Sequence, residues 1–246
     1  MELGRGSAKV IASAIQAAGE KVMISSPWIG RKFVDVLIEK ALAGVQVYVI
    51  TMDLEDNEGR VLARAADYYG EDELRRAGLE VARWRERWRA NRIALFRDPL
   101  LSFFLSALLV LFSHVFPGYS SLLYVGALGL IAAGVALAIY RARSGRSIKA
   151  QLLSAEAELE RTTKTVASAR ESIRRNLRAL VIPLDVAFVH AKLYIADRRA
   201  WASSANLTES GMNNNIEVVV EVDPSQAESA FMALWSRLAA EVSPRS

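Results

Sequence analysis

Two long uncharged stretches in the middle of the chain constrain its fold more than any other feature. The first runs from Pro99 to Phe116 and has one histidine but no formally charged side chain. The second, from Ser120 to Tyr140, carries no charge either. At about 1.5 Å per residue, a helix of either length can cross a hydrocarbon core of roughly 30 Å. Pro117-Gly118 between them is typical of a turn, so the stretches predict a helical hairpin.

The hairpin can be interpreted as a transmembrane pair or as the buried hairpin of a soluble protein. Two adjacent uncharged runs of this length favour the membrane, and their place within the chain argues against a signal peptide. Positive flanks stay on the cytoplasmic side. We therefore expect a two-span protein of the cell membrane, with both termini and both soluble arms in the cytoplasm. The flanking cations are Arg83, Arg85, Arg87, Arg89, Arg92 and Arg97 before the hairpin, and Arg141, Arg143, Arg146 and Lys149 after it.

Individual residues within the runs have simpler interpretations. His114 lies near the turn, and we interpret it as an interfacial residue, not as a catalyst. Small residues on the second run predict a close-packing face for the partner helix or for a second chain. They are Gly126, Gly129, Ala133 and Gly134.

A long helix is predicted after the hairpin. From Ile148 to Leu180, mostly apolar residues recur at alternating steps of four and three, which is typical of a coiled-coil seam. The alternative is an amphipathic helix that lies on its own domain. Trp84, Trp88, Asn91 and Leu95 repeat the step, so the short helix before the hairpin is a candidate partner for this stalk.

The flanking arms read as alternating strands and helices. Residues 21–28 and 33–50 predict a strand, a helix ended by Gly44 and a second strand. We interpret Gly78–Arg83 as a further strand that closes the first half. This gives residues 1–83 as the first half of one α/β domain and 84–180 as an insertion. Residues 181–246 are its second half.

The second half contains a concentration of reactive side chains. Alternation over Phe188–Ala196 predicts a strand with His190, Lys192 and Tyr194 on one face. His190 and Lys192 would then lie about 7 Å apart, near enough to hold one phosphate. The return strand, Trp201 to Ser204, would deliver Ser204 and Asn206 beside them. Glu217 begins another predicted strand, from Ile216 to Val222. A base or nucleophile, a cation and hydroxyl or amide donors are what phosphodiester cleavage requires.

The spacing H-x-K-x4-D, followed by S-x-N and a glutamate on the next strand, resembles the phospholipase D superfamily. The resemblance covers roughly residues 6–84 and 181–240. It departs at Ser203, where the family usually has glycine before the motif serine. It implies an α/β fold with a mixed sheet flanked by helices, here interrupted by the transmembrane hairpin and the coiled-coil-like helix.

The resemblance also implies roles for the motif residues. His190, Lys192 and Glu217 would be catalytic. Lys192 with Ser204 and Asn206 would bind the substrate phosphate, and Asp197 would be mainly structural. The family joins two such motifs at one active site, and this chain has one. A complete site then requires a homodimer, in which one His190 forms a phosphohistidine and the other transfers protons, with no metal and no cofactor.

Composition narrows the partners without identifying the substrate. No cysteine is present, and the two histidines lie in no tight carboxylate cluster, so we expect no metal site. The net charge of +4 suits a phosphate-bearing partner, or equally the positive flanks of membrane spans. The single-motif architecture resembles the nuclease branch of the superfamily, which implies a nuclease acting on nucleic acid. The alternatives are a phospholipase D or other lipid phosphodiesterase, and a catalytically inactive membrane scaffold.

Overall fold

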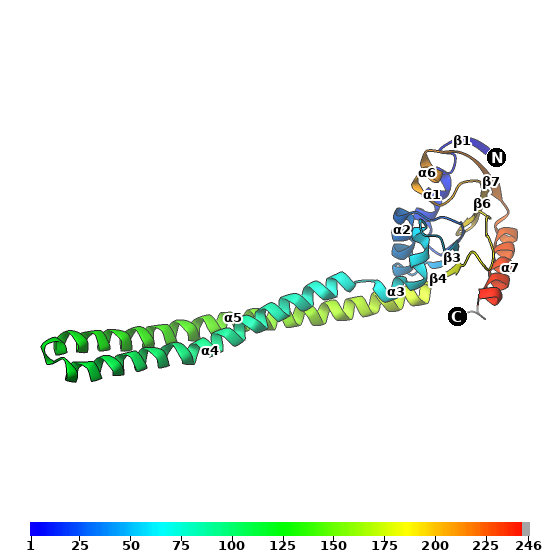
Figure 1. Cartoon of the computed structure of the whole chain (residues 1–246). Coiled ribbons are helices and arrows are strands. Elements are labelled where there is room, and N and C mark those ends of the chain that lie inside the picture. Colours follow the sequence, from blue (N-terminus) through cyan, green and yellow to red (C-terminus); the bar gives the residue numbers. More distant parts are fainter. Residues whose placement is uncertain (243–246) are drawn as a thin grey trace. The chain divides into compact units, whose positions relative to one another are not determined.

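The computed structural model describes residues 1–242, which form two compact units (Figure 1). One unit combines Met1–Tyr69 with the chain from Val166 onward. The other is the intervening segment, Gly70–Thr165. The first is an α/β unit, and the second is a helical hairpin inserted into its sequence.

The α/β unit is built on one mixed seven-stranded sheet, in the order β1-β7-β6-β5-β2-β3-β4. β2, β3 and β4 are parallel to one another, whereas the other neighbouring strands pair in antiparallel fashion. A mixed sheet flanked by helices is therefore confirmed. The strands are β1 (Glu2–Arg5), β2 (Lys21–Ser25), β3 (Gln46–Met52), β4 (Leu177–Ile182), β5 (Leu193–Ala196), β6 (Arg199–Ser203) and β7 (Ile216–Val222).

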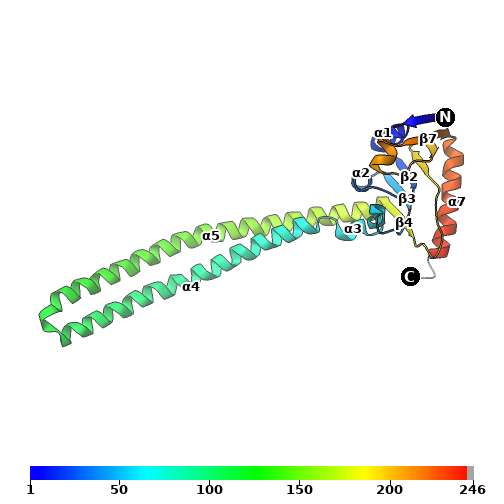
Figure 2. The ribbon, with the colours of Figure 1, turned by 45° about the horizontal axis from the view of Figure 1, so that its top comes forward.

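Helices cover both faces of this sheet (Figures 1 and 2). Ile24 and Tyr194 face α1 (Lys9–Ala17) and α2 (Arg31–Leu42), where they join the larger hydrophobic core. Their strand neighbours face the other way and pack with Phe231 of α7 (Pro224–Val242). The predicted strand–helix–strand opening is present as β2, α2 and β3. Its helix ends before Gly44, whose φ of 93° is left-handed. The remaining short elements are η1 (Glu58–Arg64), α3 (Ala65–Tyr68) and α6 (Glu209–Asn213).

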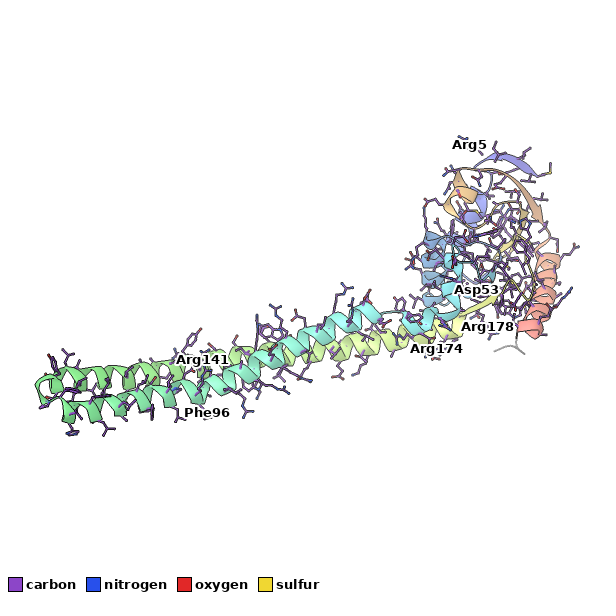
Figure 3. The ribbon with its side chains drawn as sticks, viewed as in Figure 1. Arg5, Asp53, Phe96, Arg141, Arg174 and Arg178 are labelled. Atoms are coloured by element: carbon purple, nitrogen blue, oxygen red, sulfur yellow. The ribbon has the colours of Figure 1, made fainter. Side chains whose placement is uncertain are left out.

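The inserted hairpin consists of α4 (Glu71–Val115), the turn η2 (Pro117–Tyr119) and α5 (Ser120–Asn176), whose last residues belong to the α/β unit. Both helices contain an apolar window long enough to cross a membrane, and only 6% of that window in α4 and 11% in α5 is buried. Phe96, labelled in Figure 3, is one of many large apolar side chains on the hairpin that face outward, and it is 67% exposed. The interpretation as a buried hairpin is therefore wrong for the single chain.

Two boundary predictions around the hairpin are wrong. Gly78–Arg83 is helical, because α4 already starts after Gly70 with three acidic residues in its first turn, where the helix dipole favours negative charge. The stalk helix ends at Asn176 and not at Leu180. The Asn176 side chain bonds Ala41 and Gln46, and the next residues join the sheet as β4.

Close packing within the hairpin uses part of the predicted small-residue face. A Cβ atom on Gly134 would lie 2.8 Å from Ser102, and one on Gly126 would lie 3.3 Å from Leu109. A Cβ atom on Gly129 would meet nothing within 4 Å. Gly126 and Gly134 therefore let α5 approach α4, whereas Gly129 lies on open surface.

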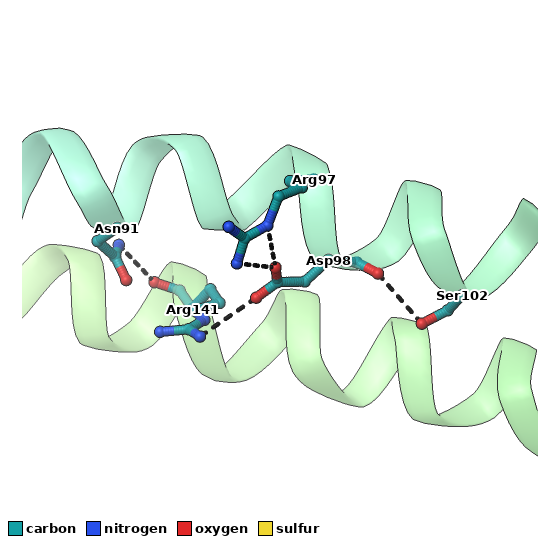
Figure 4. Close-up of polar contacts among 5 residues, drawn as sticks. All are labelled: Asn91, Arg97, Asp98, Ser102 and Arg141. Atoms are coloured by element: carbon teal, nitrogen blue, oxygen red, sulfur yellow. Dashed lines mark hydrogen bonds and ion pairs between the residues drawn. The ribbon is translucent and has the colours of Figure 1, made fainter.

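A polar cluster crosses the hairpin just before the first apolar run (Figure 4). Asp98 pairs with Arg97 of its own helix at 2.8 Å and with Arg141 of α5 at 3.2 Å. The Asn91 amide donates to the Arg141 carbonyl at 3.1 Å. Asp98 has a lowered pKa, mainly because of its hydrogen bond with Arg97. Asp98 directly precedes the first uncharged run, and Arg141 directly follows the second.

Candidate functional site

Most of the predicted site residues lie near the start of β5, the end of β6 and the start of β7. The strand expected over Phe188–Ala196 is real only from Leu193 onward, and residues 188–192 form a loop. This loop has no strand partner on the β2 side, because β2 stops at Ser25 before Pro27. The Ser25 hydroxyl instead donates to the Ala191 carbonyl at 3.1 Å. The loop is therefore tied to the sheet by side chains, not by a strand ladder.

His190 lies in this loop with its imidazole exposed. The ring stacks on Phe188, with 5.8 Å between the centroids and 20° between the planes. Val189 between them is buried and donates its N–H to the sulfur of Met52 at 3.3 Å. Within residues 1–242, no hydrogen bond or ion pair joins the imidazole to Lys192, Ser204, Asn206 or Glu217. The grouping of these residues around the histidine stays a prediction.

Lys192 is buried, with only 9% of its surface exposed. Its ammonium donates to the carbonyl of His190 at 3.1 Å. Burial lowers the pKa of the ammonium, and the negative charge of Glu217 works in the opposite direction. A desolvated cation beside one carboxylate is well suited to attract a phosphate group.

Glu217 connects the strands of the site. Its carboxylate accepts hydrogen bonds from the Ser204 hydroxyl and, at 3.2 Å, from the Asn215 amide. Its carbonyl accepts from Ser7 at 2.8 Å, which ties the loop after β1 to β7. The Ser204 hydroxyl also accepts the N–H of Val218 at 3.0 Å. Ser204 and Glu217 thus form a fixed pair, with Lys192 near enough to feel the charge.

The Asn206 side chain forms no hydrogen bond to this pair within the residues that the structure describes. Its Oδ1 atom is buried and has no hydrogen-bond partner within the described range. The neighbouring backbone is held firmly, since Tyr194 donates to the Ala205 carbonyl at 2.7 Å and Ser26 accepts the N–H of Leu207 at 3.1 Å. The structure therefore fixes the backbone around Asn206 and leaves its amide oxygen unpaired.

Asp197 lies at the other end of β5 from Lys192, where it binds backbone N–H groups. Its carboxylate accepts the N–H groups of Gly19, Glu20 and Lys21, each at 2.9 Å. Burial opposes its ionisation, but these three bonds outweigh that effect and hold its pKa below the ordinary value. Its φ of 51° is the left-handed conformation that aspartate tolerates better than most residues. These contacts join the start of β2 to the end of β5.

Sequence reasoning missed three residues that support the site. Tyr194 was placed on the face of Lys192 without a role, yet it is fully buried. Burial raises its pKa, and its hydroxyl anchors Ala205. Asn215 and Ser7 hold Glu217, and no motif marks either of them. The alternation that placed Tyr194 beside Lys192 was the one available signal.

No group of three or more His, Cys, Asp or Glu side chains that could hold a metal ion occurs within residues 1–242. His114 lies in the last turn of α4, in the other unit.

Comparisons with known proteins show a similarity of fold to a solved structure. No protein-family model matches the chain, and neither does any curated protein. The structure is similar to the crystal structure of a phospholipase D family member, Nuc from Salmonella typhimurium. The match covers 98% of this chain and 93% of that one, at 14% sequence identity and a TM-score of 0.40. A similarity this distant says nothing about activity, which has to be inferred from the residues themselves.

Proposed function

We propose that the protein is a membrane-anchored phosphodiesterase of the phospholipase D type, acting first of all as a nuclease. The observation that carries the proposal is the cluster near the start of β5, the end of β6 and the start of β7. There a desolvated Lys192 lies near the hydrogen-bonded Ser204–Glu217 pair, two residues from the exposed His190. A nucleophile open to solvent close to a buried cation suits attack on a phosphate ester.

The proposed reaction has two steps. His190 attacks phosphorus, the bond to the leaving oxygen breaks, and a second imidazole gives that oxygen a proton. The second imidazole then takes a proton from water, which displaces the phosphorylated His190. Lys192, Ser204 and Asn206 hold the non-bridging oxygens throughout. Asn206 would do this through its Nδ2 group, because its unpaired Oδ1 is an acceptor and cannot bond a phosphate oxygen.

The second imidazole has to come from a second copy. The only other histidine, His114, is in the hairpin. A two-fold axis next to His190 would bring two equivalent loops together and complete the site. We assign to Glu217 the task of orienting a histidine and stabilising its charged form, a contact that the single chain does not make.

The hairpin is the proposed membrane anchor. Its apolar windows have a mean hydropathy of 1.8 and 2.4, and their side chains face outward instead of into a protein core. Polar residues return at Asp98 and Arg141, and arginines follow on both helices. In water such an exposed apolar surface would be strongly unfavourable, whereas a bilayer would cover it.

The same anchor keeps a lipid phosphodiesterase as the second candidate. An enzyme attached to a bilayer meets phospholipid headgroups at high local concentration. The same site residues could cleave the phosphodiester of a lipid or of a nucleic acid.

The deciding experiment is an assay of the purified protein on single-stranded DNA, RNA and phospholipid vesicles. His190→Ala should abolish cleavage of the true substrate, whereas His114→Ala, its matched control, should retain it. Cleavage of phospholipid vesicles alone would favour the lipid phosphodiesterase over the nuclease. No cleavage of any of the three by a folded protein would oppose both.

A further inference from the structure

An open groove separates α4 and α5 in the part of the hairpin farthest from η2. It has a volume of about 940 Å³. Half-buried Ala77, Trp84 and Ala155 line its middle, and exposed charged residues such as Arg83 and Glu158 line its rims. Two helices alone leave this strip of side chains only partly covered. A further pair of helices would cover it.

The charges of the groove are balanced and ordered by height. Three arginines and three glutamates line it, which disfavours a polyanion such as nucleic acid as the occupant. Arg85 and Glu156 pair across the hairpin at 2.9 Å, so these positions lie at one level. The helices are antiparallel, so a step of two residues back along α4 and two residues forward along α5 goes in the same direction. It brings Arg83 level with Glu158. Arg83 has only a weak partner on its own helix, Glu80 at 3.7 Å. Glu158 has no ion pair within residues 1–242.

We propose that this groove binds the same groove of a second copy, to form a four-helix bundle in which Arg83 of each chain pairs with Glu158 of the other. The inference rests on the membrane insertion proposed above. Two hairpins inserted in the same direction lie parallel and at the same depth, so a two-fold axis along them sets α4 of one beside α5 of the other at equal height. If α4 and α5 carry opposite charges at one level, each helix therefore meets the opposite charge on the second copy.

A charge exchange between two differently tagged full-length chains tests this pairing in vesicles. Arg83→Glu chains mixed with one another bring like charges together twice, and so do Glu158→Arg chains. In the mixed pair, both contacts between chains are again attractive, whereas the contacts within each chain remain repulsive. Recovery of one tag with the other, measured at several dilutions, reports the association. Arg89→Glu is the matched control, because Arg89 is exposed on α4 outside the groove.

We expect each variant to associate with itself roughly tenfold more weakly than the unmodified chain, and the mixed pair to associate nearly as well as it does. Association that is equal in all combinations, or a mixed pair no better than the single variants, overturns the proposal. Equal, strong association together with intact cleavage would place the dimer contact in the α/β unit. That result would leave the proposed activity standing. Flotation of each sample with the vesicles checks separately that the hairpin has inserted.

Discussion

The hydroxyl of Ser204 donates to the carboxylate of Glu217 and at the same time accepts the N–H of the following residue on β7, Val218. One small side chain thus fixes both the position of a carboxylate and the spacing of two strands. Removing either partner should therefore affect the site before it affects the fold.

Glu217→Gln tests the electrostatic part of this arrangement. Burial lowers the pKa of Lys192, and the charge of Glu217 raises it. Without that charge the pKa of Lys192 should fall further. Since Lys192 must be protonated to hold phosphate, the alkaline limb of the pH–rate profile should move to lower pH. Ser204→Ala keeps the charge, so it should lower the rate by about ten- to a hundredfold without that displacement. An unmoved limb in Glu217→Gln would contradict the assignment of Lys192.

Lys192→Met should separate activity from stability. The substitution keeps the aliphatic stem and removes a desolvated cation. Cleavage should therefore be lost, while the free energy of unfolding stays equal or rises by about 1 kcal/mol. His190→Ala should likewise abolish cleavage, and the exposure of this imidazole predicts little loss of stability. Thermal unfolding measured beside activity checks both. Substantial cleavage by folded His190→Ala would rule out the phosphohistidine.

Asp197→Ala should destabilise the fold by about 2–4 kcal/mol, because three N–H groups lose their acceptor and alanine is strained at a positive φ. The folded-state pKa of Asp197 is lowered, so its charge contributes stability above the unfolded pKa of about 3.9. That stability is lost as the pH falls through the folded pKa. Asp197→Asn should therefore unfold with a weaker dependence on acid pH. Denaturant titrations at pH 3 to 7 provide the measurement.

Mixing chains tests the shared site. If both histidines are required, activity should fall as the square of the active fraction when His190→Ala chains exchange into the protein. Arg89→Glu chains, which keep every site residue, should leave activity unchanged in the same mixture. A linear fall with His190→Ala would mean that each chain works alone.

Leu128→Arg tests the membrane spans. Leu128 is 66% exposed in the middle of the second apolar run, where an arginine should oppose insertion by roughly 3 kcal/mol. Leu153→Arg is its control, since Leu153 is 56% exposed on the same helix beyond the run and should tolerate charge. Extraction of membranes with alkaline carbonate distinguishes the two. Equal release of both variants would argue against a span at Leu128.

Local patterns predicted the elements whose own residues determine them. The alternation of Ile216–Val222 and the apolar spacing ended by Gly44 both correspond to real elements. Gly78–Arg83 misled, because a short alternating run also fits one face of a helix, and only the continuous α4 decides between them. The strand predicted at 188–192 was wrong for a different reason. Whether it is a strand depends on where β2 ends, far away in the sequence.

The sequence motif named candidate site residues but not the contacts between them. The motif pointed to Lys192, Ser204 and Glu217, and the structure places these side chains near one another. The motif could not reveal that Glu217 is hydrogen-bonded to Ser204 and Asn215 and not to His190. Those contacts arise from the register of β6 on β7, which a single sequence does not encode locally.

The order of strands has a consequence for how the chain is made. β2 pairs with β5, and Ser25 bonds Ala191, a residue 166 positions later. β1 likewise waits for β7. While the hairpin emerges from the ribosome, the first half can form only the β2–β3 pair, with both edges open. We expect the hairpin to enter the bilayer before the sheet closes, so that conditions which delay β4 and β5 leave those strand edges open to aggregation.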